Sequence, residues 1–187
     1  MRWTNLPNLL TLSRLVLVPF AVTAIAAGDY RRALAIFVVA AATDGLDGFL
    51  ARRFGWLTRI GAYLDPVADK ALLNGAWLAL GIAGAAPIWL VALVFGRDLL
   101  ILAMVAAAIL FTKYRSFPPS MWGKISTFLQ IAGALVALVH LAFPRPELEG
   151  LARPLLWLVA AGTAWSGVDY IRRAVVTLLN KRETPVH

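Results

Sequence analysis

Apolar segments recur along the whole chain, and only short polar spacers separate them. A run of about 20 apolar residues is long enough for one helix to cross a lipid bilayer. Of the 187 residues, 60% are apolar and only 15% are charged, and the mean hydropathy is +0.75. A water-soluble domain of this length has no core large enough to hide so many apolar residues. The sequence therefore predicts an all-α, polytopic membrane protein.

Six segments match the length of a transmembrane helix, at residues 9–27, 32–53, 61–83, 87–111, 121–143 and 152–179. Helix-breaking residues separate them, among them Gly28, Gly55, Gly84 and Pro118. The spacers are too short to hold a further domain, and no internal repeat is visible. We therefore expect six transmembrane helices in one membrane domain, residues 1–187. The first segment is longer than a signal-peptide core, which favours a retained helix.

Basic residues are distributed unequally between the two predicted sides of the membrane. The side that holds both termini carries Arg2, Arg14, Arg52, Arg53, Arg59, Lys113, Arg115, Lys124, Arg172, Arg173, Lys181 and Arg182. The other side carries Arg31, Arg32, Arg145 and Arg153. Basic residues concentrate on the cytoplasmic side of membrane proteins. Both termini are therefore expected in the cytoplasm, and the protein is expected in a membrane such as the bacterial inner membrane.

The formal net charge is +8, which raises the question of a nucleic-acid partner. The basic residues lie at the ends of apolar segments and do not form one stripe with interleaved aromatic residues, so nucleic acid is not expected. Anionic lipid headgroups and phosphorylated substrates suit this distribution better. The chain has no cysteine, which excludes a thiolate nucleophile or thiolate metal ligand.

Four aspartates fall inside the second and third apolar segments: Asp44, Asp47, Asp65 and Asp69. A carboxylate at the centre of a membrane helix costs about 2.5–3.5 kcal/mol on insertion scales, so such residues need a compensating partner and usually serve a function. Asp44 and Asp47 share one helix face, and Asp65 and Asp69 share another. The short turn between the two segments makes them antiparallel. We therefore expect the four carboxylates to converge in the cytoplasmic half of the membrane.

Converging carboxylates repel one another at low dielectric unless a cation neutralises them. Oxygen ligands without cysteine or histidine favour Mg²⁺, Mn²⁺ or Ca²⁺ over Zn²⁺. The alternative is a set of buried ion pairs with Arg52, Arg59 or Lys70, which explains four neighbouring carboxylates less well.

Small residues and one arginine accompany the aspartates. Gly48 and Ala51 leave space for a nucleotide beside the second segment, and Gly61 leaves space on the third. Arg52 can bind a phosphate with two parallel hydrogen bonds. Taken alone, the small residues also fit helix packing, and Arg52 also fits an interfacial anchor.

The stretch from Asp44 to Asp69 matches the pattern Asp-x₂-Asp-Gly-x₂-Ala-Arg-x₈-Gly-x₃-Asp-x₃-Asp at every fixed position. It resembles the signature of the CDP-alcohol phosphotransferases. The resemblance extends to the opening segment Asn5–Arg14, to Asp65–Lys70 and to Gly123–Thr127 with Gln130.

This resemblance implies six transmembrane helices, a homodimer, a cavity open to the cytoplasm and two divalent cations, Mg²⁺ or Mn²⁺. It implies that the metal ligands are Asp44, Asp47, Asp65 and Asp69, and that Asp69 is also the general base. The implied CDP-binding residues are Asp44, Gly48, Ala51, Arg52, Thr58 and Gly61.

The family members that this chain resembles most are the phosphatidylglycerophosphate synthases, which transfer a phosphatidyl group from CDP-diacylglycerol to glycerol 3-phosphate with release of CMP. The CDP-diacylglycerol-dependent cardiolipin synthases, which use phosphatidylglycerol, are the alternative. Both acceptors are phosphate-bearing alcohols, and the basic residues expected to bind them are Arg97, Lys124, Arg172 and Arg173. Arg97 has an alternative use in an ion pair with Asp98 or Asp169, and Lys124 has one as an interfacial residue. A carboxylate-lined transporter is a third hypothesis, disfavoured because no inverted repeat is visible.

Overall fold

A computed structural model of the protein describes residues 6–54, 59–111 and 120–180, and the side chains of residues 12–43, 68–107, 120–148 and 150–176. Six helices account for these residues: α1 (Leu6–Ala26), α2 (Tyr30–Phe54), α3 (Arg59–Ile82), α4 (Ile88–Phe111), α5 (Met121–Ala142) and α6 (Pro146–Asn180). No strand occurs in the described part of the chain. The predicted all-α fold is therefore confirmed.

The first five helices begin and end within a few residues of the predicted segments, but the start of the sixth was predicted wrongly. It begins at Pro146 and not near residue 152. Proline is well tolerated in the first turn of a helix, because the N–H that it lacks has no partner inside the helix. Pro146 therefore starts α6 here, although the sequence pattern favoured it as part of a connection.

Local hydrogen bonds and backbone angles explain several helix boundaries. Gly28 and Gly84 adopt a φ of +75° just after α1 and α3, a conformation that glycine adopts without strain. The Asp29 carboxylate accepts a hydrogen bond from the backbone N–H of Arg32 (3.2 Å) at the start of α2. Ser120 caps α5 by accepting one from the N–H of Gly123 (2.9 Å).

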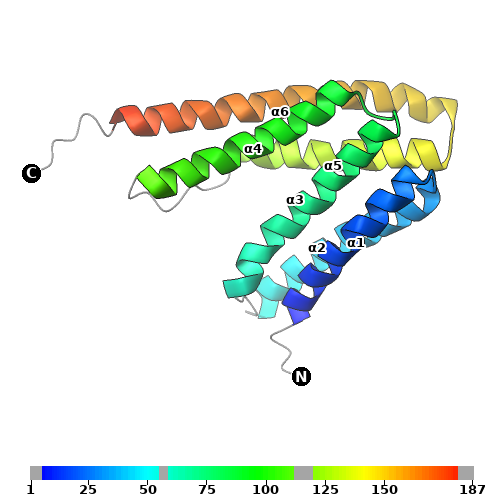
Figure 1. Ribbon diagram of the computed structural model, residues 1–187, viewed down its shortest axis with the longest axis horizontal. Helices are drawn as coiled ribbons and strands as arrows, with labels where there is room; N and C mark the ends of the chain where they lie inside the picture. The colour runs from blue at the N-terminus through cyan, green and yellow to red at the C-terminus, as the bar shows by residue number, and fades with distance from the viewer. Residues whose placement is uncertain (1–5, 55–58, 112–119, 181–187) are drawn as a thin grey trace, which may run out of the picture.

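The helices form two groups of three, α1–α3 and α4–α6 (Figure 1). Within the first group, α1 packs against both α2 and α3; within the second, α6 packs against both α4 and α5. The groups are joined where α2 packs on α5 and where α3 packs on α4 and α5. The short connections after α1, α3 and α5 all lie toward one end of the molecule (Figure 1).

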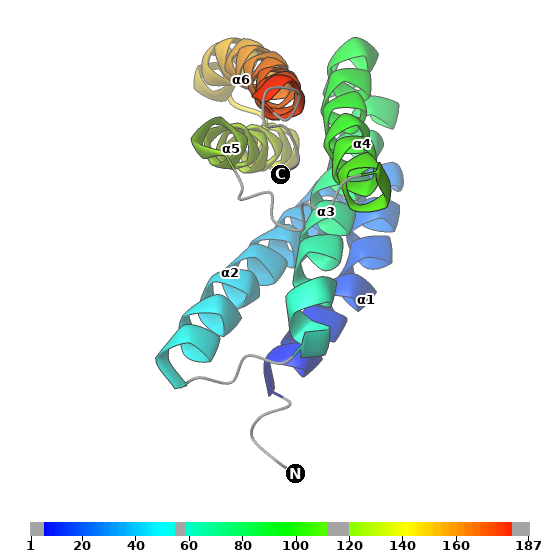
Figure 2. The ribbon, with the colours of Figure 1, turned by 90° about the vertical axis from the view of Figure 1, so that its left-hand side faces the viewer.

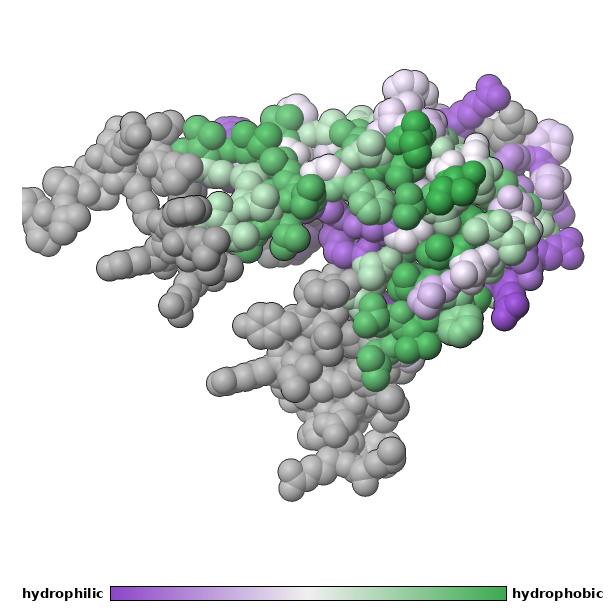
Figure 3. Space-filling view, in the orientation of Figure 1, coloured by the Kyte–Doolittle hydropathy of each residue, from purple (hydrophilic) through white to green (hydrophobic). Residues whose placement is uncertain are grey.

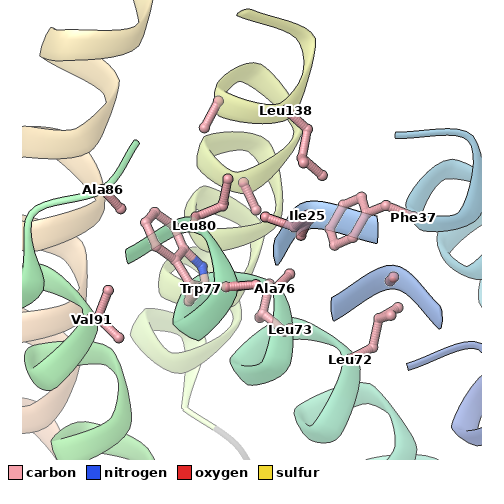
Figure 4. Close-up of a cluster of buried hydrophobic side chains, with 14 of the residues drawn as sticks. Ile25, Phe37, Leu72, Leu73, Ala76, Trp77, Leu80, Ala86, Val91 and Leu138 are labelled. Carbon is pink, nitrogen blue, oxygen red and sulfur yellow. The ribbon is translucent and has the colours of Figure 1, made fainter. Parts of the chain in front are cut away.

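The hydrophobic core lies where the two groups meet (Figure 4). It contains Ile25 from α1, Phe37 from α2, Trp77 and Leu80 from α3, and Leu138 from α5, all of them almost completely buried. Residues from four helices thus enclose one cluster, and this cluster holds α3 against α5.

Large apolar side chains also cover the outside of the molecule. Leu99, Phe128 and Trp157 are 67%, 71% and 68% exposed. Figure 3 shows apolar surface over both helix groups, with hydrophilic surface gathered at the end that holds the short connections and in a patch between the groups. Exposed apolar surface on this scale suits a lipid environment.

Two helices of the described chain are long and apolar enough to cross a membrane, at Ile88–Ala107 and Met121–Ala142. A shorter apolar helical stretch covers Leu12–Ala26. The predicted count of six spans goes beyond these two segments.

Candidate active site

The four aspartates of the signature lie on the two helices that the sequence predicts. Asp44 and Asp47 belong to α2, and Asp65 and Asp69 belong to α3. Figure 2 shows α2 running toward its end at Phe54 and α3 running back from Arg59. The side chains of the first three aspartates lie outside the described ones, so the convergence of four carboxylates stays a prediction.

The predicted CDP-binding residues lie near the same ends of the two helices. Gly48, Ala51 and Arg52 belong to α2, and Gly61 belongs to α3, each with its side-chain environment outside the described part of the structure. Thr58 itself lies outside the described residues. Both helices pack on α1.

The Asp69 side chain is described, and its partner comes from α1. The Arg14 guanidinium donates a hydrogen bond to the Asp69 carboxylate. Arg14 is almost completely buried, whereas the Asp69 side chain is 46% exposed. A guanidinium inside an apolar helix pair needs a counter-charge, and Asp69 supplies it. The Asp69 carboxylate is therefore partly accessible while the Arg14 guanidinium binds one of its oxygen atoms.

A second charged cluster surrounds Asp98 on α4. Its Oδ1 atom accepts hydrogen bonds from Lys70 Nζ (2.6 Å) and from Arg97 Nη1 (2.8 Å). Its Oδ2 atom accepts one from Asn74 Nδ2 (3.2 Å). Lys70 and Asn74 are one turn apart on α3, so Asp98 joins α3 to α4. Lys70, which makes this contact, directly follows Asp69 in the sequence.

The Arg97 guanidinium extends the cluster to α5 and α6. Nε and Nη2 donate to Ser166 Oγ on α6 (3.2 and 2.8 Å), and Nη2 also approaches the Gly123 carbonyl oxygen on α5 (3.4 Å). The Tyr170 ring lies 5.7 Å from the guanidinium carbon. Arg97 therefore makes the ion pair with Asp98 that was one of its two uses in the sequence analysis.

The remaining predicted acceptor-binding residues are exposed. Lys124 lies on the first turn of α5, next to Gly123. Arg172 and Arg173 are exposed on α6, and Arg173 Nε donates to Asp169 Oδ2 (2.9 Å). Lys124 directly follows Gly123, whose carbonyl oxygen contacts Arg97.

A neutral polar cluster lies between α5 and α6. Gln130 Nε2 donates to Thr163 Oγ1 (3.1 Å) and to Ser126 Oγ (3.3 Å), and all three residues are buried. These hydrogen bonds pair the Gln130 amide nitrogen with two hydroxyl groups between the helices, as small polar residues do between membrane helices.

The sequence analysis did not find Asn74, Ser166 or Tyr170 as members of the charged cluster. One signal was available, because small polar residues within apolar segments usually face another helix. That signal does not say which helix they face.

No group of three or more histidine, aspartate or glutamate side chains forms a metal site among the side chains that the structure describes. This search reaches only one of the four predicted ligands, Asp69.

A family model for CDP-alcohol phosphatidyltransferases matches residues 4–165. The chain belongs to this family. The match begins just before α1 and continues into α6, so it includes both aspartate-bearing helices of the CDP-alcohol phosphatidyltransferase. Of the Asp98 cluster it includes Lys70, Asn74, Arg97 and Asp98, whereas Ser166 and Tyr170 lie just beyond it.

Curated bacterial relatives align with nearly the whole of this CDP-alcohol phosphatidyltransferase. A probable phosphatidylglycerophosphate synthase of Mycobacterium tuberculosis (strain ATCC 25618 / H37Rv) is 35% identical over 98% of this chain and 88% of its own length. The CDP-diacylglycerol–glycerol-3-phosphate 3-phosphatidyltransferase of Pectobacterium atrosepticum is 38% identical over 94% of this chain and 97% of its own. The Bacillus subtilis enzyme of that name is 30% identical, over 90% and 94%. The apolar helices and these relatives together indicate a membrane protein.

Proposed function

We propose that this protein transfers a phosphatidyl group from CDP-diacylglycerol to glycerol 3-phosphate and releases CMP. The observation that carries the proposal is the alignment with relatives named for this reaction across 94–98% of the chain. The signature from Asp44 to Asp69 is complete, and the accessible Asp69 carboxylate lies next to the charged cluster.

The proposed reaction is an in-line displacement at the phosphorus atom that carries the diacylglycerol group. A hydroxyl oxygen of the acceptor forms the new bond to phosphorus, and the bond from that phosphorus to the CMP oxygen breaks. Asp69 accepts the hydroxyl proton. The exposed edge of its carboxylate suits this role, while Arg14 holds the opposite side of the group in place.

We propose that Asp44, Asp47, Asp65 and Asp69 bind two divalent cations, Mg²⁺ or Mn²⁺. The donor chemistry fits, because all four are carboxylates in a chain without cysteine, and the described member is accessible. Bound there, the cations would neutralise the diphosphate and stabilise the departing CMP. We propose that Asp44, Gly48, Ala51, Arg52, Thr58 and Gly61 bind the CDP group.

For the acceptor we propose a basic region formed by Lys124, Arg172 and Arg173, with Arg97 behind it. Lys124 adjoins Gly123, whose carbonyl oxygen contacts Arg97. The Lys124, Arg172 and Arg173 side chains are exposed, whereas the buried Arg97 guanidinium contributes its charge from within the protein.

We further propose one membrane domain with six spans, both termini and the active site in the cytoplasm, and a homodimer. The common position of the three short connections supports an even number of crossings (Figure 1). The exposed residues Asp29, Arg31 and Arg145 at these connections give that end a polar surface.

The experiment is a transfer assay with purified protein in detergent, CDP-diacylglycerol and Mg²⁺ or Mn²⁺. Glycerol 3-phosphate, phosphatidylglycerol, inositol phosphate and serine are supplied in turn, and CMP and the radiolabelled lipid product are measured. We expect product with glycerol 3-phosphate and its loss when EDTA removes the cations. Cardiolipin formation from phosphatidylglycerol alone would overturn the acceptor assignment, and no product with any acceptor would overturn the enzymatic proposal.

A further inference from the structure

Two basic side chains, Lys70 and Arg97, share one carboxylate in the Asp98 cluster. Lys70 and Arg97 each bring a positive charge, and both donate to the same Oδ1 atom of Asp98. Asn74, which donates to the other carboxylate oxygen, is neutral. The neighbouring residue Asp69 pairs with Arg14 of α1. The Asp98 cluster thus holds one positive charge in excess between α3 and α4, where an uncompensated charge is costly and an anion is favoured.

Arg97 and Lys70 differ in how many of their N–H donors are already used in hydrogen bonds. Arg97 donates to Asp98, Ser166 and the Gly123 carbonyl oxygen, and its side chain is 5% exposed. Four of the five guanidinium N–H donors are thus used, and the burial of the side chain restricts access to the fifth. Arg97 is therefore closed to a substrate in this arrangement.

Lys70 is open. Its ammonium group has three N–H donors, and Asp98 is its one hydrogen-bond partner among the described residues. The Lys70 side chain is 39% exposed, against 11% for Asp98. The excess charge of the cluster is therefore presented at the Lys70 ammonium group, and Asp98 fixes the position of that group.

Lys70 also adjoins the proposed base. Successive side chains of a helix diverge by about 100°, and Asp69 accordingly contacts α1 while Lys70 contacts α4. Glycerol 3-phosphate carries a hydroxyl and a phosphate at opposite ends of a three-carbon chain. Asp69 and Lys70 are consecutive residues of α3, so such a molecule offers one group to each of them.

We propose that Lys70 binds the phosphate of the acceptor, and that Asp98 is the residue that positions Lys70 for this contact. The inference rests on the proposed transfer to glycerol 3-phosphate and adds a specific phosphate ligand to it. Lys70 thereby selects acceptors that place a phosphate near the attacking hydroxyl.

The test compares wild type with Lys70→Gln, Lys70→Arg and, as a control, Arg32→Gln, which alters an exposed arginine at the end that holds the short connections. Loss of a charged hydrogen bond of this kind weakens binding by about 10-fold or more. We expect Lys70→Gln to raise the KM for glycerol 3-phosphate by about that factor, with kcat and the KM for CDP-diacylglycerol within about 3-fold of wild type. Lys70→Arg should restore most of the affinity, and Arg32→Gln should behave as wild type.

A normal KM for glycerol 3-phosphate in Lys70→Gln would overturn the inference while leaving the proposed function intact. A rise confined to the KM for CDP-diacylglycerol would also overturn it, because the phosphate contacted would then be that of the donor. A wild-type protein that fails to use glycerol 3-phosphate would instead refute the proposed function.

Inorganic phosphate allows a binding test that requires no catalytic turnover. We expect phosphate to raise the Tm of the wild-type protein and to raise that of Lys70→Gln much less. An equal rise in both proteins would overturn the inference.

Asp98→Asn tests the positioning role. Its expected signature is a raised KM for glycerol 3-phosphate with Lys70 still present, and an unchanged KM would refute that role. Because this variant leaves Lys70 and Arg97 without their carboxylate partner, it can fail to fold. Asp98→Glu is therefore measured beside it and should retain part of the affinity for glycerol 3-phosphate.

Discussion

At the scale of single residues, the candidate site places two ionic arrangements side by side on α3. Asp69 pairs with a buried arginine of α1 and keeps an accessible edge. Lys70 pairs with Asp98 of α4, which also holds Arg97. Arg14, Lys70 and Arg97 each lie beside a carboxylate, as the cost of a buried charge favours. The two arrangements face different helices because their α3 residues are adjacent in sequence.

The role of Asp69 is tested by Asp69→Asn. The amide cannot accept the acceptor proton, and general base catalysis contributes about 10²–10⁴ in rate. We expect transfer to fall by at least about 100-fold while the protein still inserts in the membrane and binds CDP-diacylglycerol. CMP release and binding of labelled CDP-diacylglycerol are the two measurements. Turnover near the wild-type rate would refute the assignment of Asp69 as the base.

The role of Arg97 within the protein is tested by Arg97→Gln. Removing one partner of a buried ion pair costs about 3–5 kcal/mol, and Ser166 and the Gly123 carbonyl oxygen would lose a donor as well. We expect a clear fall in Tm in detergent. Arg97→Lys should recover little of it, because an ammonium group cannot reproduce the forked contacts of a guanidinium. An unchanged Tm in Arg97→Gln would contradict this account.

At the scale of helices, close packing fixes how α5 meets its neighbours. A Cβ atom at Gly133 would lie 2.7 Å from Val159 Cγ2 on α6 and 3.3 Å from Trp77 Cζ2 on α3. Glycine at this position therefore lets three helices approach one another beside the core that Figure 4 shows. Small residues at helix crossings have this role in membrane proteins.

This packing predicts that Gly133→Ala destabilises the protein. Forcing extra carbon atoms into a packed interior costs about 1–3 kcal/mol, and a lower Tm in detergent is the expected readout. Gly96→Ala is the matched control, because a Cβ atom at Gly96 meets nothing within 4 Å. An equal effect of the two substitutions would show that packing at Gly133 is not the cause.

At the scale of the whole molecule, the Asp98 cluster lies where the two helix groups meet. Lys70 and Asn74 come from the group α1–α3, and Arg97, Asp98 and Ser166 come from the group α4–α6. The Asp98 cluster therefore joins the groups near the proposed base. A change in the angle between the groups would alter the position of Asp98 relative to Lys70.

The proposed topology is tested by single cysteines, since the chain has none of its own. We expect a membrane-impermeant maleimide to label Asp29→Cys and Arg145→Cys from outside intact cells. Lys181→Cys should react only after the membrane is opened. Labelling of all three positions from outside would contradict a cytoplasmic C-terminus.

Much of the fold followed from the sequence because bilayer thickness sets the length of apolar segments. Five helices were placed within a few residues, and the aspartates were assigned to the correct two helices. The start of α6 was missed because proline is compatible both with a connection and with the first turn of a helix. The partners of Arg14 and Lys70 were also not determined, since helical periodicity places a residue on a face without naming the helix opposite.

The sequence by itself determined the aspartate signature, the helical class and the family, because these depend on residue types at fixed spacings along one or two helices. Only the tertiary structure decided that Arg14 neutralises Asp69 and that Asp98 is shared by Lys70 and Arg97. It also decided that Arg97 is buried and Lys70 partly exposed, because burial depends on how the other helices pack around each side chain. The sequence analysis assigned Arg97 as a possible acceptor ligand; because Arg97 uses most of its donors within the protein, our proposal adds Lys70 as the residue that contacts the acceptor phosphate.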